Sequence, residues 1–237
     1  GHDAGKSMTT ATGNIVIGTE AGNDMTSAAN NVLIGNVSGD KLITGELNVA
    51  VGAQSLSADT DGAYNTAIGA LALTTQDFTT TTNSMNTAVG ALAGRRITVG
   101  VENTLIGGQA GDHLTDSDGS VAVGFNALSA ATEGRRNVAI GKTALATETL
   151  GSRNVAVGYH SLENQNFDTA TNSLNCAVGY ASGNQISDGV QNAFFGALAG
   201  DGTDDGDGNT AVGYIALSSN CGDENTAVGH SALSVTT

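Results

Sequence analysis

Four aspartates lie close together near the C-terminal end of the chain, at Asp201, Asp204, Asp205 and Asp207. Closely spaced carboxylates and turn carbonyls suit a hard cation such as calcium. A related stretch, 112–120, keeps three aspartates, but neither stretch has the spacing of an EF-hand or of a calcium-binding nonapeptide repeat. The stretch has two interpretations: a calcium site or a solvated acidic turn. The acidic turn is favoured, and calcium is the only cofactor that the sequence suggests.

Aromatic rings recur at one position of a repeat in the C-terminal half of the chain. Exposed rings can stack on a sugar or another ligand, or they can pack against a neighbouring chain, and packing is favoured. The residues are Phe125, Tyr159, Tyr180, Tyr214 and His230.

Two further aromatic residues, Phe78 and Phe167, occupy matching positions in insertions at 74–84 and 163–173. Insertions in solenoid proteins collect on one face, which is often the binding face. Both rings are therefore candidate ligand contacts, with the alternative that the insertions cover a junction between repeat blocks.

Residues suited to catalysis do not gather in the sequence. His113, His160 and His230 lie many repeats apart, so no Ser-His-Asp set or histidine metal site can converge within one chain. The carboxylates are spread over predicted turns instead of forming the facing pair that a glycosidase needs. We therefore expect no enzymatic activity.

A repeat of about 17 residues must position all of these groups. The motif Asn-x-Ala-Val/Ile-Gly occurs in thirteen copies from Asn14 onward, eight of them exact and five close variants, with spacings of 17 broken twice by 21 and once by 16. The β-branched residues are strand formers, and the repeat is too short for a helix pair. The sequence predicts an all-β, parallel β-solenoid of about thirteen 17-residue rungs. Residues 1–13 are a lead-in and 14–237 a continuous repeat domain with blocks 14–85, 86–174 and 175–237.

The positions of the motif are counted from its opening Asn as place 0. Side chains at places 1 and 3 should face one way and those at places 2 and 4 the other. Place 3 is always Val, Ile or Phe, place 2 is apolar and place 4 is always Gly. Both faces are thus apolar or minimal, which predicts that both are buried. One thin roll covers only one of them, so the other needs a partner.

The core volume is held nearly constant along the repeat. Place 8 alternates between Gly and Leu, and most rungs with Gly there carry a large apolar residue at place 11. The larger residues at place 2 also fall in the Gly rungs, as close packing requires.

Polar and small residues at fixed places are predicted to be structural. Place −3 is usually Gly or Asn, residues that tolerate positive φ at a tight corner. The opening Asn is predicted to form a ladder along the stack, with the alternative that it serves only its own turn. Structural residues selected on these grounds are Asn48, Asn65, Asn86, Asn137 and Asn154, with Gly52, Gly69, Gly90, Gly141 and Gly158 at place 4.

The composition excludes several partners. The formal charge is −15 with eight Lys and Arg, which argues against nucleic acid and against an anionic membrane surface. No stretch is apolar enough to span a membrane, and the first residues lack the pattern of a signal peptide. Cys176 and Cys221 lie two rungs apart, too far for an unstrained disulfide, so both are predicted to be free thiols.

The strings SVAVGFNALS at 120–129, NVAIGKTAL at 137–145 and NTAVGYIAL at 209–217 resemble the repeats of YadA-like trimeric adhesin heads and of bacteriophage tail fibres. The resemblance covers nearly the whole chain and implies a left-handed β-roll that assembles as a homotrimer. It implies a structural and adhesive fibre segment of a virion, with a host glycan or protein as partner. The alternative is a bacterial surface adhesin head, also extracellular. An ice-binding solenoid is a third hypothesis, weakened because the Thr column at place 1 is interrupted.

Overall fold

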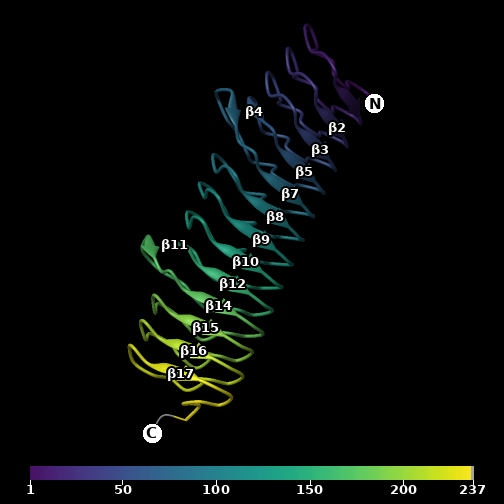
Figure 1. Cartoon of the computed structure of the whole chain (residues 1–237). Helices are drawn as coiled ribbons and strands as arrows, with labels where there is room; N and C mark the ends of the chain where they lie inside the picture. Colours follow the sequence, from purple (N-terminus) through teal and green to yellow (C-terminus); the bar gives the residue numbers. More distant parts are fainter. Residues whose placement is uncertain (236–237) are drawn as a thin grey trace. The chain divides into compact units, whose positions relative to one another are not determined.

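The computed structural model describes residues 1–235, in which strands, turns and bends are present and no helix occurs. Most strands are three residues long and coincide with places 1 to 3 of the motif. The chain divides into two compact units, Gly1–Gly119 and Ser120–Thr237. Each unit is a stack of rungs (Figure 1).

In the first unit, six strands form one parallel ladder in the order of the sequence. These strands are β1 (Ile15–Ile17), β2 (Val32–Ile34), β3 (Val49–Val51), β5 (Thr66–Ile68), β7 (Thr87–Val89) and β8 (Thr104–Ile106).

In the second unit, seven strands form the equivalent ladder. These are β9 (Val121–Val123), β10 (Val138–Ile140), β12 (Val155–Val157), β14 (Cys176–Val178), β15 (Ala193–Phe195), β16 (Thr210–Val212) and β17 (Thr226–Val228).

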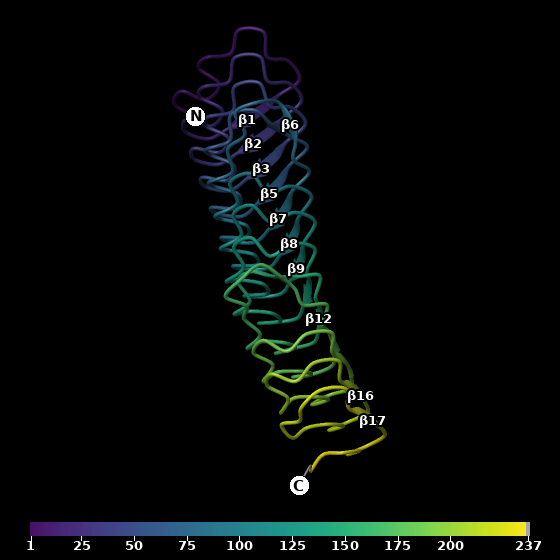
Figure 2. The same ribbon diagram turned by 90° about the vertical axis from the view of Figure 1, so that its left-hand side faces the viewer.

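Each strand pairs in parallel with its equivalent one repeat later, so Val49 lies opposite Thr66 and Val138 opposite Val155. The turns between strands are bonded in the same register; for example, the Gly22 N–H donates to the Ser38 carbonyl at 2.9 Å. Figure 2 shows the rungs stacked one after another along each unit. The predicted parallel β-solenoid and its number of rungs are confirmed.

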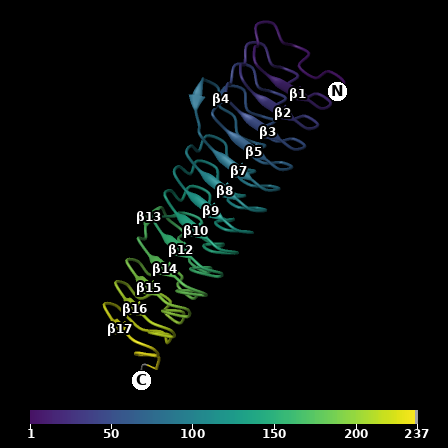
Figure 3. The same cartoon turned by 45° about the vertical axis from the view of Figure 1, so that its right-hand side comes forward.

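Each insertion adds a short parallel pair to its unit. β4 (Gly62–Ala63) pairs with β6 (Thr82–Asn83), and β11 (Gly151–Ser152) pairs with β13 (Thr171–Asn172). In Figure 3 the segments bearing β4 and β13 project beyond the neighbouring rungs of their own units.

The core of each unit comes from places 2, 7, 8 and 11. Place 2 is buried in every rung after the first, as at Ala50 and Phe194. Where place 8 is Gly, the space is filled by other core side chains: a Cβ on Gly39 would lie 2.7 Å from Leu33, and one on Gly200 2.6 Å from Phe194. The predicted exchange of volume between places is thus visible atom by atom.

The Asn at place 0 forms a buried ladder that bonds to the next rung. The Asn48 Nδ2 donates to the Gly62 carbonyl at 2.9 Å, and its Oδ1 accepts the backbone N–H of Asn65 at 2.9 Å. The pattern recurs in the second unit, where Asn137 bonds to the Gly151 carbonyl and to the Asn154 N–H. Each Asn therefore connects two rungs instead of serving only its own turn. Asn86 likewise bonds to the Gly100 carbonyl.

Glycine at place 4 is required by contact as well as by conformation. At Gly52 φ is +140°, and a Cβ there would lie 2.5 Å from the carbonyl oxygen of Gly69. The equivalent glycines stack in the same way, so any side chain would push two rungs apart. The same contact recurs at Gly69, Gly90, Gly141 and Gly158.

The prediction that glycine occupies place −3 because it tolerates positive φ is wrong. Gly45 and Gly134 do not have positive φ; the positive-φ corner is at place −1, where residues such as Leu47 and Arg136 adopt it. Glycine is needed at place −3 because a Cβ on Gly45 would lie 2.3 Å from the carbonyl oxygen of Gly62.

The N-terminal residues 1–13 are bonded to the first rung. The Gly5 N–H donates to the Ala21 carbonyl at 2.9 Å, and Thr12 forms a parallel bridge with Ala29. The lead-in therefore continues the stack in the N-terminal direction. Nowhere in residues 1–235 is there a helix with the length and apolar character needed to span a bilayer.

Candidate interaction surfaces

The outer face of the main strands carries an apolar surface in each unit. We call the place 3 side chains the outer stripe; they are Ile17, Ile34, Val51, Ile68, Val89 and Ile106 in the first unit, and Val123, Ile140, Val157, Val178, Phe195, Val212 and Val228 in the second. Place 2 points into the core, so place 3 points outward. Ile17 is 56% exposed and Ile106 is 41% exposed. The half-buried residues of place 1 widen the same face.

The outer stripe is the face that the sequence assigned to a partner. Single exposed apolar residues are ordinary, but a continuous row of Val and Ile along a sheet is typical of an interaction surface. Within one chain, six of the thirteen side chains of the stripe are half-buried and seven are exposed, so the row stays open in part. The stripe can form contacts and offers no group for chemistry.

An aromatic column follows the outer stripe in the second unit, at place 5. Phe125, Tyr159, Tyr180 and Tyr214 are between 39% and 54% exposed. The rings of Tyr159 and Tyr180 are stacked, with centroids 5.8 Å apart and planes 12° from parallel. The Lys142 Nζ lies 5.5 Å from the centroid of Tyr159. The facing sides of the Tyr159 and Tyr180 rings cover each other. The stacked pair therefore offers ring edges and hydroxyl groups to an external partner.

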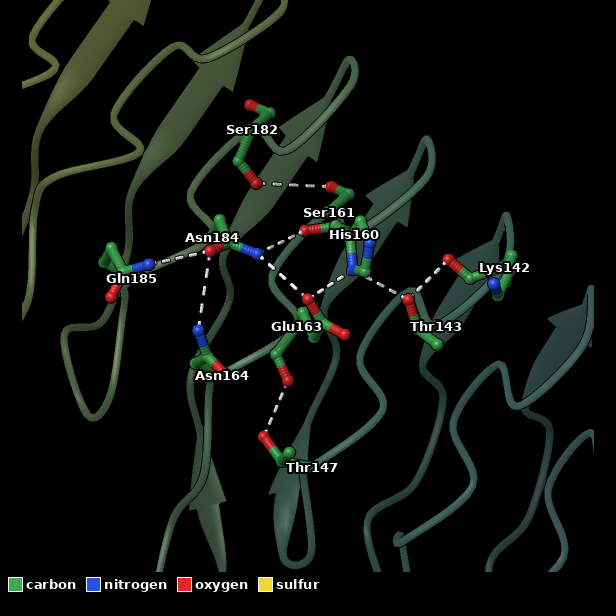
Figure 4. A network of polar contacts seen from close by, with 10 residues as sticks. All are labelled: Lys142, Thr143, Thr147, His160, Ser161, Glu163, Asn164, Ser182, Asn184 and Gln185. Carbon is green, nitrogen blue, oxygen red and sulfur yellow. Dashed lines mark hydrogen bonds and ion pairs between the residues drawn. The ribbon is translucent and has the colours of Figure 1, made fainter.

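A polar network borders this column (Figure 4). The ring of His160 contacts that of Tyr159, and its Nδ1 lies close to the Glu163 carboxylate and 3.0 Å from the Thr143 hydroxyl. The Asn184 Nδ2 donates to Glu163 Oε2 at 3.2 Å and to the His160 carbonyl at 3.1 Å. The network joins side chains at places 6 and 9 of successive rungs.

The network presents hydrogen-bond donors and acceptors. Two hydroxyls lie beside His160: Thr143 donates to the Lys142 carbonyl at 2.8 Å, and the buried Ser161 donates to the Ala177 carbonyl at 3.0 Å. The sequence reasoning did not foresee this cluster. Places 6 and 9 meet because places 6 and 8 both have positive φ, as at His160 and Leu162, and the motif carries no sign of that turn.

The structure corrects the prediction that the aromatic residues of the insertions contact a ligand. Phe78 and Phe167 are 7% and 6% exposed, so their rings are held in the packing of the insertion and are not offered to a ligand. The alternative, in which the insertions cover a junction between repeat blocks, stays a prediction.

A buried carboxylate lies beneath each insertion. Asp59 accepts the backbone N–H of Gly62 at 2.9 Å and of Phe78 at 3.3 Å, and the Gln76 side chain donates to it at 2.6 Å. Gln76 in turn accepts from Asn86 at 2.9 Å. Burial raises the pKa of Asp59, while the bond from Gln76 acts to lower it.

The second unit repeats this arrangement with a longer acid. Glu148 accepts the Gly151 N–H at 2.6 Å and the Gln165 amide at 2.5 Å, and Gln165 accepts from Asn175 at 2.8 Å. These buried networks anchor the insertions, and the repeat motif carries no sign of them.

The acidic stretch does not converge into a cation cage. Asp207 accepts the Val190 N–H at 2.8 Å, and the Asp204 N–H donates to Asn220 at 3.4 Å. Asp205 is exposed, and Asp201 is half-buried with its pKa raised by burial. Across residues 1–235, no group of three or more His, Cys, Asp or Glu side chains is close enough to hold a metal ion. Cys176 and Cys221 are free thiols.

Comparison with known proteins gives no relative: no protein-family model, no curated protein and no solved structure matches the chain.

Proposed function

We propose that the chain is a segment of a homotrimeric fibre of a phage or phage-like particle that contributes to attachment to a host surface. The observation that carries the proposal is the outer stripe, an apolar row on a sheet whose opposite face already forms the core. Copies of the chain that pack stripe against stripe would remove this surface from water.

The number of chains and the left hand of the roll rest on the resemblance of the repeat. A strand with an apolar residue on both faces requires a covering partner but does not fix how many copies provide it. A closed ring of identical chains satisfies every stripe at once. The extracellular location, on a virion or on a bacterial surface, rests on the same resemblance.

The first experiment measures the mass of the purified protein by light scattering. A trimer has three times the 23.4 kDa of one chain. The matched pair of variants is Ile106→Lys in the stripe and Val99→Lys, which is 50% exposed but lies outside the main strands. We expect Ile106→Lys to weaken assembly and Val99→Lys to leave it unchanged. A wild-type monomer at high concentration contradicts the proposal.

Attachment is tested separately from assembly. The aromatic column and the His160 network are the surfaces that would contact a glycan or protein, since they offer ring edges, tyrosine hydroxyls and amide groups side by side. A glycan array with the wild type and with Tyr180→Ala checks this role. Equal glycan binding by both proteins would contradict a role of Tyr180 in the contact.

A further inference from the structure

The first unit contains an ion pair between neighbouring rungs at place 9. The Arg95 Nη2 donates to Asp112 Oδ2 at 3.0 Å, and the Arg95 Nε lies 2.9 Å from Oδ1 at an angle unsuited to a hydrogen bond. The guanidinium thus lies alongside both oxygens, and the side chain of Asp112 is only 5% exposed beneath it.

The second unit contains the duplicate of this pair with one partner exchanged. The chain repeats itself at an offset of 89 residues, which places Asn184 where the first unit has Arg95 and Asp201 where it has Asp112. The backbone contact is the same in both copies: the Arg96 N–H donates to the Asp112 carbonyl, and the Gln185 N–H donates to the Asp201 carbonyl. Two side chains beside the carboxylate differ: Arg95 is replaced by Asn184, and His113, whose Nδ1 lies 3.5 Å from Asp112 Oδ2, is replaced by Gly202.

Asn184 does not replace the lost guanidinium. Its amide nitrogen donates to Glu163 and to the His160 carbonyl, and its oxygen accepts from Gln185 at 2.8 Å (Figure 4). All of its bonds are therefore directed away from Asp201. The Asp201 Oδ1 is buried and forms no hydrogen bond to another residue among residues 1–235, while the backbone N–H of Asp201 itself acts to lower the pKa of its carboxyl.

We propose that Asp201 is a docking site for a guanidinium group supplied from outside the chain, as the side chain of an arginine on a binding partner. The first unit shows that a guanidinium at this position of the rung fits against the equivalent carboxylate, with a hydrogen bond from Nη2 to Oδ2 and with Nε 2.9 Å from Oδ1. A guanidinium docked on Asp201 in the same way would add a charge-assisted hydrogen bond to the carboxylate.

The chemistry favours guanidinium over a metal ion. Calcium takes six to eight oxygen ligands, and Asp201 stands without the further carboxylates that such a set needs. A planar guanidinium needs only one carboxylate and provides paired donors in a fixed geometry. This inference does not depend on the number of chains in the assembly.

The probe is the peptide acetyl-Gly-Arg-Gly-amide, observed by saturation-transfer-difference NMR, which suits large assemblies. Its matched peptides contain Lys or Gln in place of Arg. We expect saturation of the arginine methylene signals with the wild type. Asp201→Asn should reduce these signals by about fivefold or more, as expected from the loss of one charge-assisted hydrogen bond.

A gain-of-site variant provides the internal control. Arg95→Asn combined with His113→Gly gives Asp112 the same neighbouring residues as Asp201, so it should add a second site and restore a signal to the Asp201→Asn protein. The proposal is overturned if Asp201→Asn keeps the full signal, or if the Gln peptide or calcium competes as well as the Arg peptide does.

Discussion

The backbone of each rung relies on residues in the left-handed region at places −1, 6 and 8. Leu56 and Leu73 at place 8 have φ of +49° and +50°, close to the +55° of Gly39 at the same place. A side chain there costs roughly 1 kcal/mol or more in backbone strain. The cost is tolerated because the Leu side chain is buried in the core and the backbone bonds to the next rung. The exchange of Gly for Leu is therefore decided by core volume and not by φ.

Substitutions at place −3 test whether glycine is required there by close atomic contact or by backbone conformation. We expect Gly45→Ala to lower the free energy of unfolding by about 2 kcal/mol or more, because its Cβ would overlap the Gly62 carbonyl oxygen. Gly222→Ala, at the same place of the last rung, has nothing within 4 Å of its Cβ and should change stability by less than about 0.5 kcal/mol. Urea denaturation measures both; equal effects would contradict the contact argument.

Asp59 predicts a specific pH dependence. Burial raises its pKa in the folded state above the unfolded value, so the folded protein binds the proton more tightly. Its contribution to the free energy of unfolding is therefore greatest below the unfolded pKa and is lost as the pH rises through the folded pKa. From about pH 8 to about pH 4, the stability of the wild type should increase relative to Asp59→Asn.

The control for this titration is Glu133→Gln, which removes an exposed carboxylate. It controls for the loss of one carboxylate from the protein. A parallel pH profile for wild type and Asp59→Asn would show that Asp59 does not titrate as its burial requires.

At the scale of the rung, two arrangements of core volume alternate. The rung that begins at Asn31 uses Leu33 and Leu42 with Gly39, whereas the rung that begins at Ser120 uses Ala122 and Ala131 with Leu128. A change at one place is therefore compensated at another.

Transplanting one arrangement into the other tests this compensation. Leu33→Ala with Leu42→Ala should destabilise the protein by roughly 4 kcal/mol or more, since each Leu→Ala change leaves a cavity. Adding Gly39→Leu should recover a large part of the loss, because the removed Leu33 atoms are those within 3.4 Å of a Cβ on Gly39. Thermal and urea midpoints measure the series; a further loss with Gly39→Leu would refute exchange between places.

The period of the sequence was enough to predict the strands, their register and the composition of the core. These follow from alternation and volume, which each rung repeats. The contact between His160 and Glu163 was not predictable, because it depends on positive φ at places that carry no consistent glycine. The duplicated blocks show from sequence alone that Asn184 stands where the first block has Arg95. That this leaves the Asp201 carboxylate without a guanidinium was not predictable, because it depends on contact between the place 9 side chains of neighbouring rungs. The burial of Phe78 likewise depends on the path of its insertion.

At the scale of the whole molecule, a net charge of −15 opposes association of identical copies. The proposed assembly must therefore gain more from burying the outer stripe than it loses to this repulsion. Apolar burial persists in salt, whereas charge repulsion is screened over about 10 Å at 0.1 M.

Raising sodium chloride from about 10 mM to about 500 mM should consequently shift dilute protein toward the trimer, as measured by sedimentation velocity. The same salt should weaken binding of the arginine peptide to Asp201, because an ion pair is screened where an apolar contact is not. The two surfaces thus predict opposite responses in one titration. Assembly that dissociates with added salt would mean that ion pairs, and not the outer stripe, hold the chains together.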